Sequence, residues 1–153
     1  MRIPRLPPVL LAGMAVATQS WCARRSRPTP GSTVAGALLA ATSAGLMVGA
    51  ARAFHRAGTT LSPVEVDQAS AVVASGPYRF SRNPMYVGIA GLLVSHAAVR
   101  RSWLACLPAL AWIAVIDRVQ IPAEEAALRD KFPTAYRDLL DRTPRWLGRP
   151  GRG

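Results

Sequence analysis

The sequence predicts an all-α integral membrane protein, a helical bundle of about four transmembrane helices with short interfacial helices at its C-terminal end. Half of the 153 residues are apolar and 18% are charged, against about 25% in ordinary soluble domains. Asp, Glu, Lys and Arg are absent from four long stretches: residues 6–23, 28–51, 83–99 and 102–116. This pattern argues against a soluble globule, a disordered chain and a coiled coil, and it favours a single membrane domain over residues 1–153.

The first predicted span, residues 7–22, follows a short basic start. A basic start before an apolar run is also typical of a cleaved signal peptide. The residues before Cys22 read Gln-Ser-Trp, which is not a small-residue cleavage site. A retained span is therefore the favoured interpretation.

The second predicted span, residues 32–54, is the clearest. At ~1.5 Å per residue it covers roughly 34 Å, enough to cross the hydrocarbon core of a bilayer. It contains Gly45 and Gly49, a GxxxG pair. This pair either allows close approach of a neighbouring helix or is a chance feature of an Ala- and Gly-rich segment.

The third and fourth predicted spans, residues 85–99 and 103–121, are joined by a tight turn at Arg100 and Arg101. Such a short connection predicts an antiparallel helical hairpin. The third run is short for a span, and the arginines at its end can extend their side chains to the interface. Trp103 is placed like an interfacial anchor.

The C-terminal segment, residues 122–148, is polar. Pro122 suits a helix start, with Glu124 and Glu125 in the first turn, where the helix dipole favours acids. Apolar residues then recur near helical period, but Pro133 must interrupt the helix. We therefore expect two short helices that lie at the membrane surface.

The net charge of +11 arises from 19 Lys and Arg residues against eight Asp and Glu residues. The basic residues flank the apolar runs and form no single stripe, which argues against nucleic-acid binding. With four spans, most of them fall in residues 1–6, residues 52–84 and the C-terminal segment. The positive-inside rule then places these parts, and both termini, in the cytoplasm of a multi-pass inner (plasma) membrane protein.

Metal and disulfide chemistry have little support in the sequence. The two cysteines, Cys22 and Cys106, and the two histidines, His55 and His96, show no metal-ligand spacing. We expect neither a metal site nor a disulfide framework.

Two polar segments hold the residue types that do chemistry: residues 75–88 before the third span and residues 124–146 after the fourth. The hairpin brings both segments to the cytoplasmic mouth of the bundle. An unpaired carboxylate near hydrocarbon is costly, so Glu124 or Glu125 should have a partner there.

The run GPYRFSRNPMYVG (residues 76–88), the hairpin, and the run EEAALRDKFPTAYRDLLDRTPRW (residues 124–146) resemble the isoprenylcysteine carboxyl methyltransferase family and the related phospholipid N-methyltransferases. The likeness extends over about residues 58–147, including GTTLSP at 58–63. Asn83 stands where many relatives have His, and Pro133 where Gly is usual. Asn does not titrate near neutral pH, so an acid–base role is in doubt there while a binding role is not.

The resemblance implies an S-adenosylmethionine-dependent methyltransferase that acts on a lipid-like or small amphipathic acceptor, a carboxylate or an amine. A Rossmann-type methyltransferase is excluded because no GxGxxG run follows a strand pattern. The cofactor-binding residues that the resemblance implies are Tyr78, Arg82, Asn83, Pro84, Tyr86, Gly88, Glu124, Glu125, Arg145 and Trp146.

Methyl transfer from a sulfonium mainly requires that donor and acceptor are aligned and that water is excluded. Arg118 would fix a carboxylate acceptor, with Arg79 and Arg82 competing for this role. Glu124 or Glu125 would instead take the proton of an amine acceptor. Arg118 and Glu125 are therefore the predicted catalytic residues.

Two other functions stay open: a membrane reductase that uses a nicotinamide cofactor, and a non-catalytic membrane subunit. The same residues also have simple structural interpretations. The arginines near residue 80 suit anchors for anionic lipid, and the twin glutamates suit a helix N-terminus. The sequence indicates neither the methyl acceptor nor the oligomeric state.

Overall fold

A computed structural model describes residues 7–58 and 71–148, and within them every regular element is a helix. The sequence run at 58–63 lies almost entirely outside the described residues, as do residues 1–6. The elements are α1 (Pro8–Cys22), α2 (Pro30–Arg56), η2 (Gly76–Arg79), α3 (Pro84–Arg100), η3 (Trp103–Ala105), α4 (Cys106–Val115), η4 (Ile116–Gln120), α5 (Ile121–Lys131) and α6 (Pro133–Arg142).

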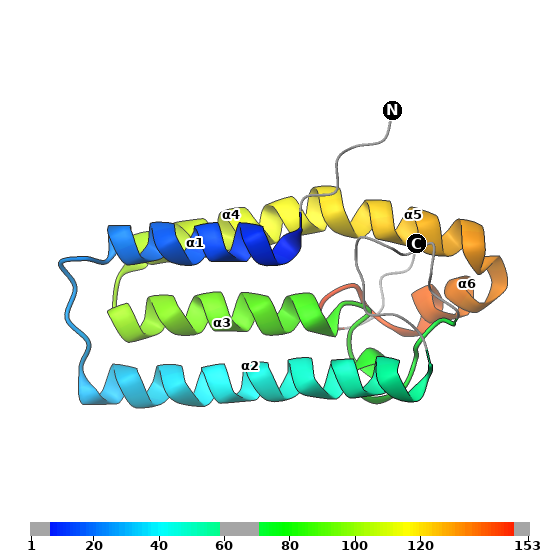
Figure 1. Cartoon of the computed structure of the whole chain (residues 1–153), viewed down its shortest axis with the longest axis horizontal. Coiled ribbons are helices and arrows are strands. Elements are labelled where there is room, and N and C mark those ends of the chain that lie inside the picture. Colours follow the sequence, from blue (N-terminus) through cyan, green and yellow to red (C-terminus); the bar gives the residue numbers. More distant parts are fainter. Residues whose placement is uncertain (1–6, 59–70, 149–153) are drawn as a thin grey trace.

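The four long helices run alongside one another (Figure 1). Helix α3 lies in the middle, with α2 on one side and the pair α1 and α4 on the other. Helix α5 continues beyond the end of α4, and α6 folds back toward the bundle. The main core fills the space among α1, α3, α4 and the start of α5; its most buried members are Leu93, Ile116 and Ile121.

Helices α2 and α3 approach closely through small residues. A Cβ atom added at Gly88 would collide with Met47, and one added at Gly91 would collide with Ser43. By contrast, Gly45 has no atom of a neighbouring element within 4 Å of an added Cβ, and Gly49 faces Pro77. The predicted Gly45–Gly49 pair is therefore not the contact between these helices.

A buried polar side chain ties the first helix to the hairpin at the end of the bundle farthest from α5. Gln19 is fully buried, and its Nε2 donates to the carbonyl oxygens of Leu93 at 2.9 Å and Ala105 at 2.8 Å. These carbonyls belong to α3 and η3. Because a buried amide without partners would cost free energy, this bridge sets the position of α1 against the hairpin.

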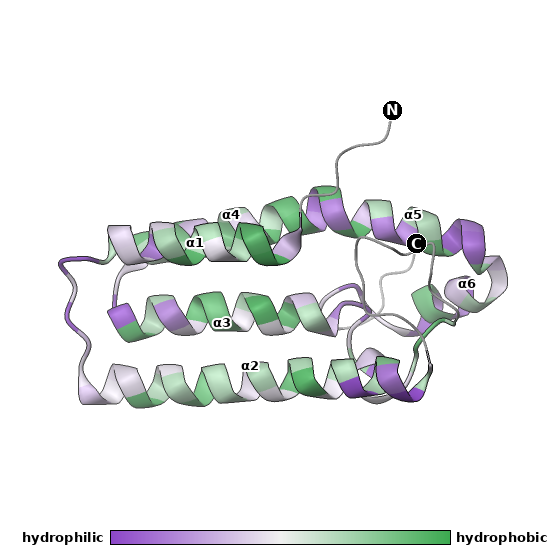
Figure 2. Ribbon diagram, viewed as in Figure 1, coloured by the Kyte–Doolittle hydropathy of each residue, from purple (hydrophilic) through white to green (hydrophobic). Residues whose placement is uncertain are grey.

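Within residues 7–58 and 71–148, two helices are long and apolar enough to cross a membrane: α2, and the continuous helix Trp103–Lys131. Their apolar stretches are mostly exposed, unlike the core helices of soluble proteins. Helices α1 and α3 have 15 and 17 residues and are shorter. Figure 2 shows hydrophobic residues along the helices of the bundle and hydrophilic ones toward its two ends: in α5 and the last turn of α2, and in the α1–α2 connection and the end of α3. The arrangement fits a membrane protein.

The structure differs from the sequence-based prediction at Pro122. We expected a helix to start there, and α5 does begin at Ile121, but it follows α4 without a break. The segment η4 between them is a π-helix, in which the N–H of Ile121 donates to the carbonyl of Ile116. Proline lacks an N–H and crowds the carbonyl four residues earlier. A wider π turn just before Pro122 lets the helix continue.

Candidate functional site

The segment just before α3 is clamped onto the end of the chain. The N–H of Arg82 donates to the carbonyl oxygen of Pro144 at 2.8 Å, and its Nη1 donates to that of Thr143. Ser81 Oγ and Asn83 Nδ2 both donate to the carbonyl oxygen of Arg145, at 3.1 and 3.0 Å. These contacts hold the non-helical stretch after α6 in one conformation against the start of α3.

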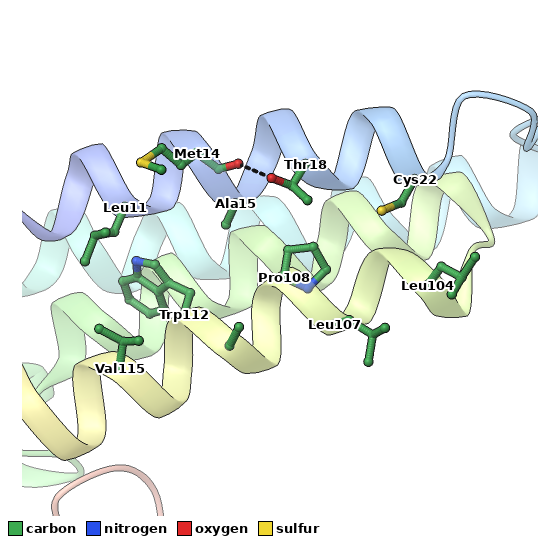
Figure 3. Close-up of a pocket in the computed structure, with 11 residues that line it drawn as sticks. Leu11, Met14, Ala15, Thr18, Cys22, Leu104, Leu107, Pro108, Trp112 and Val115 are labelled. Atoms are coloured by element: carbon green, nitrogen blue, oxygen red, sulfur yellow. Dashed lines mark hydrogen bonds between the residues drawn. The ribbon is translucent and has the colours of Figure 1, made fainter.

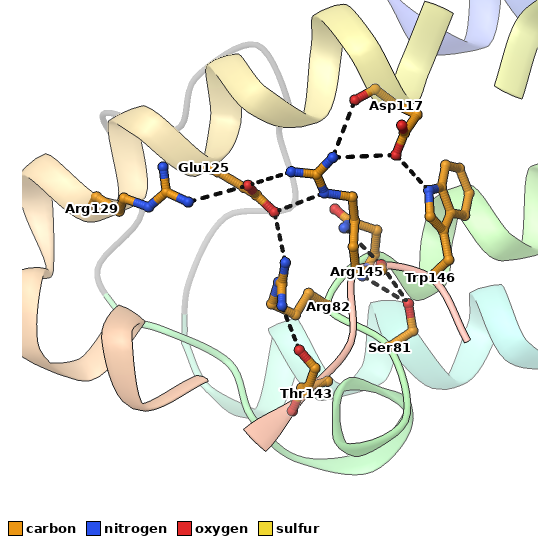
Figure 4. A network of polar contacts seen from close by, with 9 residues as sticks. Ser81, Arg82, Asp117, Glu125, Arg129, Thr143, Arg145 and Trp146 are labelled. Carbon is orange, nitrogen blue, oxygen red and sulfur yellow. Dashed lines mark hydrogen bonds and ion pairs between the residues drawn. The ribbon is translucent and has the colours of Figure 1, made fainter. Parts of the chain in front are cut away.

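Glu125 in α5 is the centre of an ionic network (Figure 4). It is only 3% exposed. Arg145 binds both carboxylate oxygens, through Nη2 to Oε2 at 2.9 Å and through Nε to Oε1 at 3.2 Å. Arg82 Nη2 adds a contact to Oε1 at 3.0 Å, and Arg129 Nη2 lies 3.5 Å from Oε2. Bidentate guanidinium–carboxylate pairs of this kind are strong and geometrically specific.

The charge state of Glu125, which lies beyond the apolar run that ends at residue 121, follows from this network. Burial by itself would raise its pKa, but the hydrogen bonds from Arg145 and Arg82 outweigh burial and lower the pKa below the usual 4.5. The same pairing raises the pKa of the Arg145 guanidinium. Glu125 is therefore an ionised carboxylate with its acceptor positions occupied, which makes it a poor proton acceptor.

Asp117, in the π segment η4, extends the network to Trp146, the last aromatic residue of the sequence. Its Oδ1 accepts a hydrogen bond from Trp146 Nε1 at 2.8 Å and one from Arg145 Nη1 at 3.3 Å. Sequence reasoning missed this residue. The available signal was a carboxylate placed directly after a charge-free stretch, a position that is costly unless it is paired.

Glu124 has different partners from its neighbour. Tyr86 in α3 donates its hydroxyl to Glu124 Oε1 at 2.6 Å, and Gln120 Nε2 donates to the same oxygen at 2.7 Å. The ring of Tyr86 packs edge-on against Trp112, with centroids 6.2 Å apart. Burial, and then the charge of Glu124, raise the pKa of Tyr78.

Comparison with known protein families gives a match over most of the chain. A family model described as phospholipid methyltransferase matches residues 32–135, from the start of α2 into α6. The chain belongs to the phospholipid methyltransferase family. A search of curated proteins finds no match to the chain. Membership confirms the resemblance seen in the sequence and makes the protein a membrane methyltransferase.

The residues predicted for the methyltransferase site fall into two groups. One group lies in or beside the network: Arg82, Asn83, Tyr86, Glu124, Glu125, Arg145 and Trp146. The match covers the first five of these residues, whereas Arg145 and Trp146 lie beyond its end. The family pattern thus brings α3 and α5 together, and the C-terminal stretch completes the cluster.

The other predicted residues lie elsewhere. Tyr78 is buried edge-on against Phe54, with centroids 5.1 Å apart. Gly88 faces α2 rather than the polar cluster, and Pro84 is fully buried at the start of α3. The side chain of Arg118 is 83% exposed and lies 3.5 Å from Asp117. Among the described contacts, none joins Arg118 to Glu124 or Glu125.

Residues 7–58 and 71–148 contain no group of three or more His, Cys, Asp or Glu side chains that could hold a metal ion. The chemistry available at this end of the methyltransferase is instead that of arginine–carboxylate pairs, phenol hydroxyls and amides. Such groups bind and orient a polar molecule.

Proposed function

We propose that the protein is a multi-pass, S-adenosylmethionine-dependent methyltransferase that transfers a methyl group to a lipid-like acceptor at the cytoplasmic face of the inner membrane. The observation that carries the proposal is that the two motif segments meet. Arg82 and Tyr86 from the first segment contact Glu125 and Glu124 from the second. The family name points to a phospholipid acceptor.

The proposed topology has four spans in one membrane domain. Helices α1 and α3 cover about 22 and 25 Å at ~1.5 Å per residue, somewhat less than the ~30 Å hydrocarbon core. Arginines at their ends, such as Arg24 and Arg100, can reach the interface. Their close packing along α4 and α2 supports counting them as spans. Both termini are then cytoplasmic, on the side of the Glu125 network.

The residues present fit S-adenosylmethionine. Arg82 Nε is a buried donor without a hydrogen-bond partner among the described residues, and it suits a carboxylate such as that of the methionine part. Glu124 offers a carboxylate for hydroxyl or amino groups, and Asn83 and Trp146 lie in or beside the network around Glu125. When bound, the cofactor supplies a methyl group on a sulfonium, whose departure leaves a neutral thioether.

The two glutamates have separate proposed roles. Glu125 is a positioning residue, because its low pKa and its arginine partners leave it unsuited to accept a proton. If the acceptor is an amine, Glu124 is the proposed proton acceptor, because it is the other glutamate of the motif and its carboxylate accepts hydrogen bonds from Tyr86 and Gln120. If the acceptor carries an anionic group, the exposed guanidinium of Arg118 remains the proposed contact.

Ligand-induced thermal stabilisation of the purified protein in detergent tests this function. A ligand that binds only the folded protein raises the melting temperature. We expect stabilisation by S-adenosylmethionine and by its demethylated product, and none by reduced nicotinamide cofactors. Stabilisation by the nicotinamide alone would favour a reductase, and no shift with any of the three would favour a non-catalytic subunit.

A further inference from the structure

An apolar groove of about 530 Å³ runs between α1 and α4 on the outer surface of the bundle (Figure 3). Leu11 and Thr18 from α1 form one wall. Leu107, Ala111 and Val115 from α4 form the other, and Trp112 lies at the same end as Val115. From Leu104 in η3 to Val115 at the end of α4 the groove extends for roughly 17 Å, at ~1.5 Å per residue.

The lining suits hydrocarbon. The hydroxyl of Thr18 donates to the carbonyl oxygen of Met14 in the same helix, at 2.9 Å. The indole N–H of Trp112 donates to the carbonyl of Pro8 at 3.1 Å. These two groups therefore offer no hydrogen to a molecule in the groove, and the remaining walls are mostly carbon. A polar ligand would lose its hydration without compensation, whereas an alkyl chain would not.

One end of the groove adjoins the proposed methyl-transfer site. Trp112 lines the groove on one side and packs edge-on against Tyr86 on the other. Tyr86 in turn donates its hydroxyl to Glu124. Arg118 follows Val115 by three residues, about one helical turn nearer the polar end, and its guanidinium is exposed. A molecule with an apolar chain and an anionic group beside it matches both features.

We propose that the groove binds one acyl chain of a phospholipid, with the lipid phosphate at Arg118. This inference rests on the proposed function, because it makes the bound lipid the methyl acceptor. Helix α1 lies outside residues 32–135, so one wall of the groove comes from a helix that the family match does not include. On this proposal the first helix helps to bind the acceptor, while the matched region and the C-terminal stretch together supply the polar site.

A photoreactive phosphatidylethanolamine, with a diazirine in one acyl chain, tests the proposal on the full-length protein in lipid nanodiscs. Irradiation should attach the probe to residues of the groove, as mapped by peptide mass spectrometry. Ala111→Trp fills the groove and should lower this labelling about tenfold. The matched control is Ala114→Trp, because Ala114 is also exposed on α4 but does not line the groove.

A second pair of measurements tests the head group. Arg118→Gln should reduce labelling by the phospholipid probe but not by a diacylglycerol that carries the same diazirine chain. Two outcomes would overturn the proposal: equal labelling of the wild-type protein and Ala111→Trp, or labelling spread evenly over all outer helix faces. Either would mean that the probe contacts the protein only as surrounding bilayer lipid. Loss of a dimer in Ala111→Trp with unchanged labelling would assign the groove to a second copy of the chain and overturn it too.

The labelling requires no cofactor, so it is independent of the proposed reaction. Thermal stabilisation by S-adenosylmethionine is measured on the same samples and should persist in Ala111→Trp. If the probe labels the groove but S-adenosylmethionine does not stabilise the wild-type protein, the proposed methyl transfer fails. The groove is then a lipid-binding site of a protein with a different function. If stabilisation holds but labelling does not follow the groove, only the inference about the groove fails.

Discussion

The surroundings of Glu124 and Glu125 differ although the two residues are adjacent in the chain. Glu125 is buried against three guanidinium groups, from Arg82, Arg129 and Arg145. The contacts of Glu124 include hydrogen bonds from a phenol hydroxyl and a side-chain amide. Glu125, which is already paired with arginines, mainly holds structure, whereas Glu124 is the carboxylate that we propose contacts a ligand. Two adjacent residues of α5 thus meet different surroundings, and Glu125 is the one that joins α5 to the C-terminal stretch through Arg145.

Removing Glu125 should produce the largest effect. In Glu125→Ala, the guanidinium groups of Arg82 and Arg145 lose their shared counter-charge in a mostly buried setting. We expect the free energy of unfolding to fall by about 3 kcal/mol. Denaturant unfolding in detergent micelles measures this, with Glu124→Ala as the matched neighbour. An unchanged unfolding midpoint for Glu125→Ala would contradict a structural role.

Acid should weaken the same region. The pKa of Glu125 is below 4.5 in the folded protein, so between the folded and unfolded pKa values the unfolded chain binds more protons. The contribution of Glu125 to stability is full above about 4.5 and is lost as the pH falls through the folded pKa. Melting temperature against pH measures this. Glu125→Gln should flatten the acid side of this curve. A wild-type protein whose melting temperature rises on acidification would contradict the predicted role of Glu125.

The contact between Asp117 and the C-terminal stretch should contribute less to the free energy of unfolding than the contacts of Glu125 do. Asp117→Asn keeps an acceptor for Trp146 Nε1 but removes the charge that faces Arg145. We expect a loss of about 1–2 kcal/mol in unfolding free energy. Asp141→Asn, at an exposed position in α6, is the control and should leave stability unchanged. Equal effects of the two substitutions would argue against the proposed link.

Glu124→Gln should affect stability least and function most. The amide oxygen can still accept from Tyr86 and Gln120, so we expect a change below about 1 kcal/mol in unfolding free energy. The lost charge should weaken S-adenosylmethionine binding by about tenfold. Isothermal titration of the folded variant measures this. A cofactor affinity equal to that of the wild-type protein would remove Glu124 from the proposed site.

Much of the architecture follows from the sequence. Charge-free stretches located the four long helices, because apolar length is a local property of the chain. The tight turn at Arg100–Arg101 implied the hairpin, and the hairpin implied that the two motif segments meet. The contacts of Arg82 with Glu125 and of Tyr86 with Glu124 agree with this expectation. The family was also readable from the motifs.

Only the tertiary structure decided which side chains pair. Consecutive residues of a helix point about 100° apart, so adjacent glutamates reach different neighbours, and composition cannot say which. The pairing of Asp117 with Trp146 likewise depends on how α4 is rotated against α3 and on where the chain returns after α6. Sequence determined where helices form, because hydrophobic runs act locally. Packing determined what each helix face meets, because that depends on residues far apart in the chain.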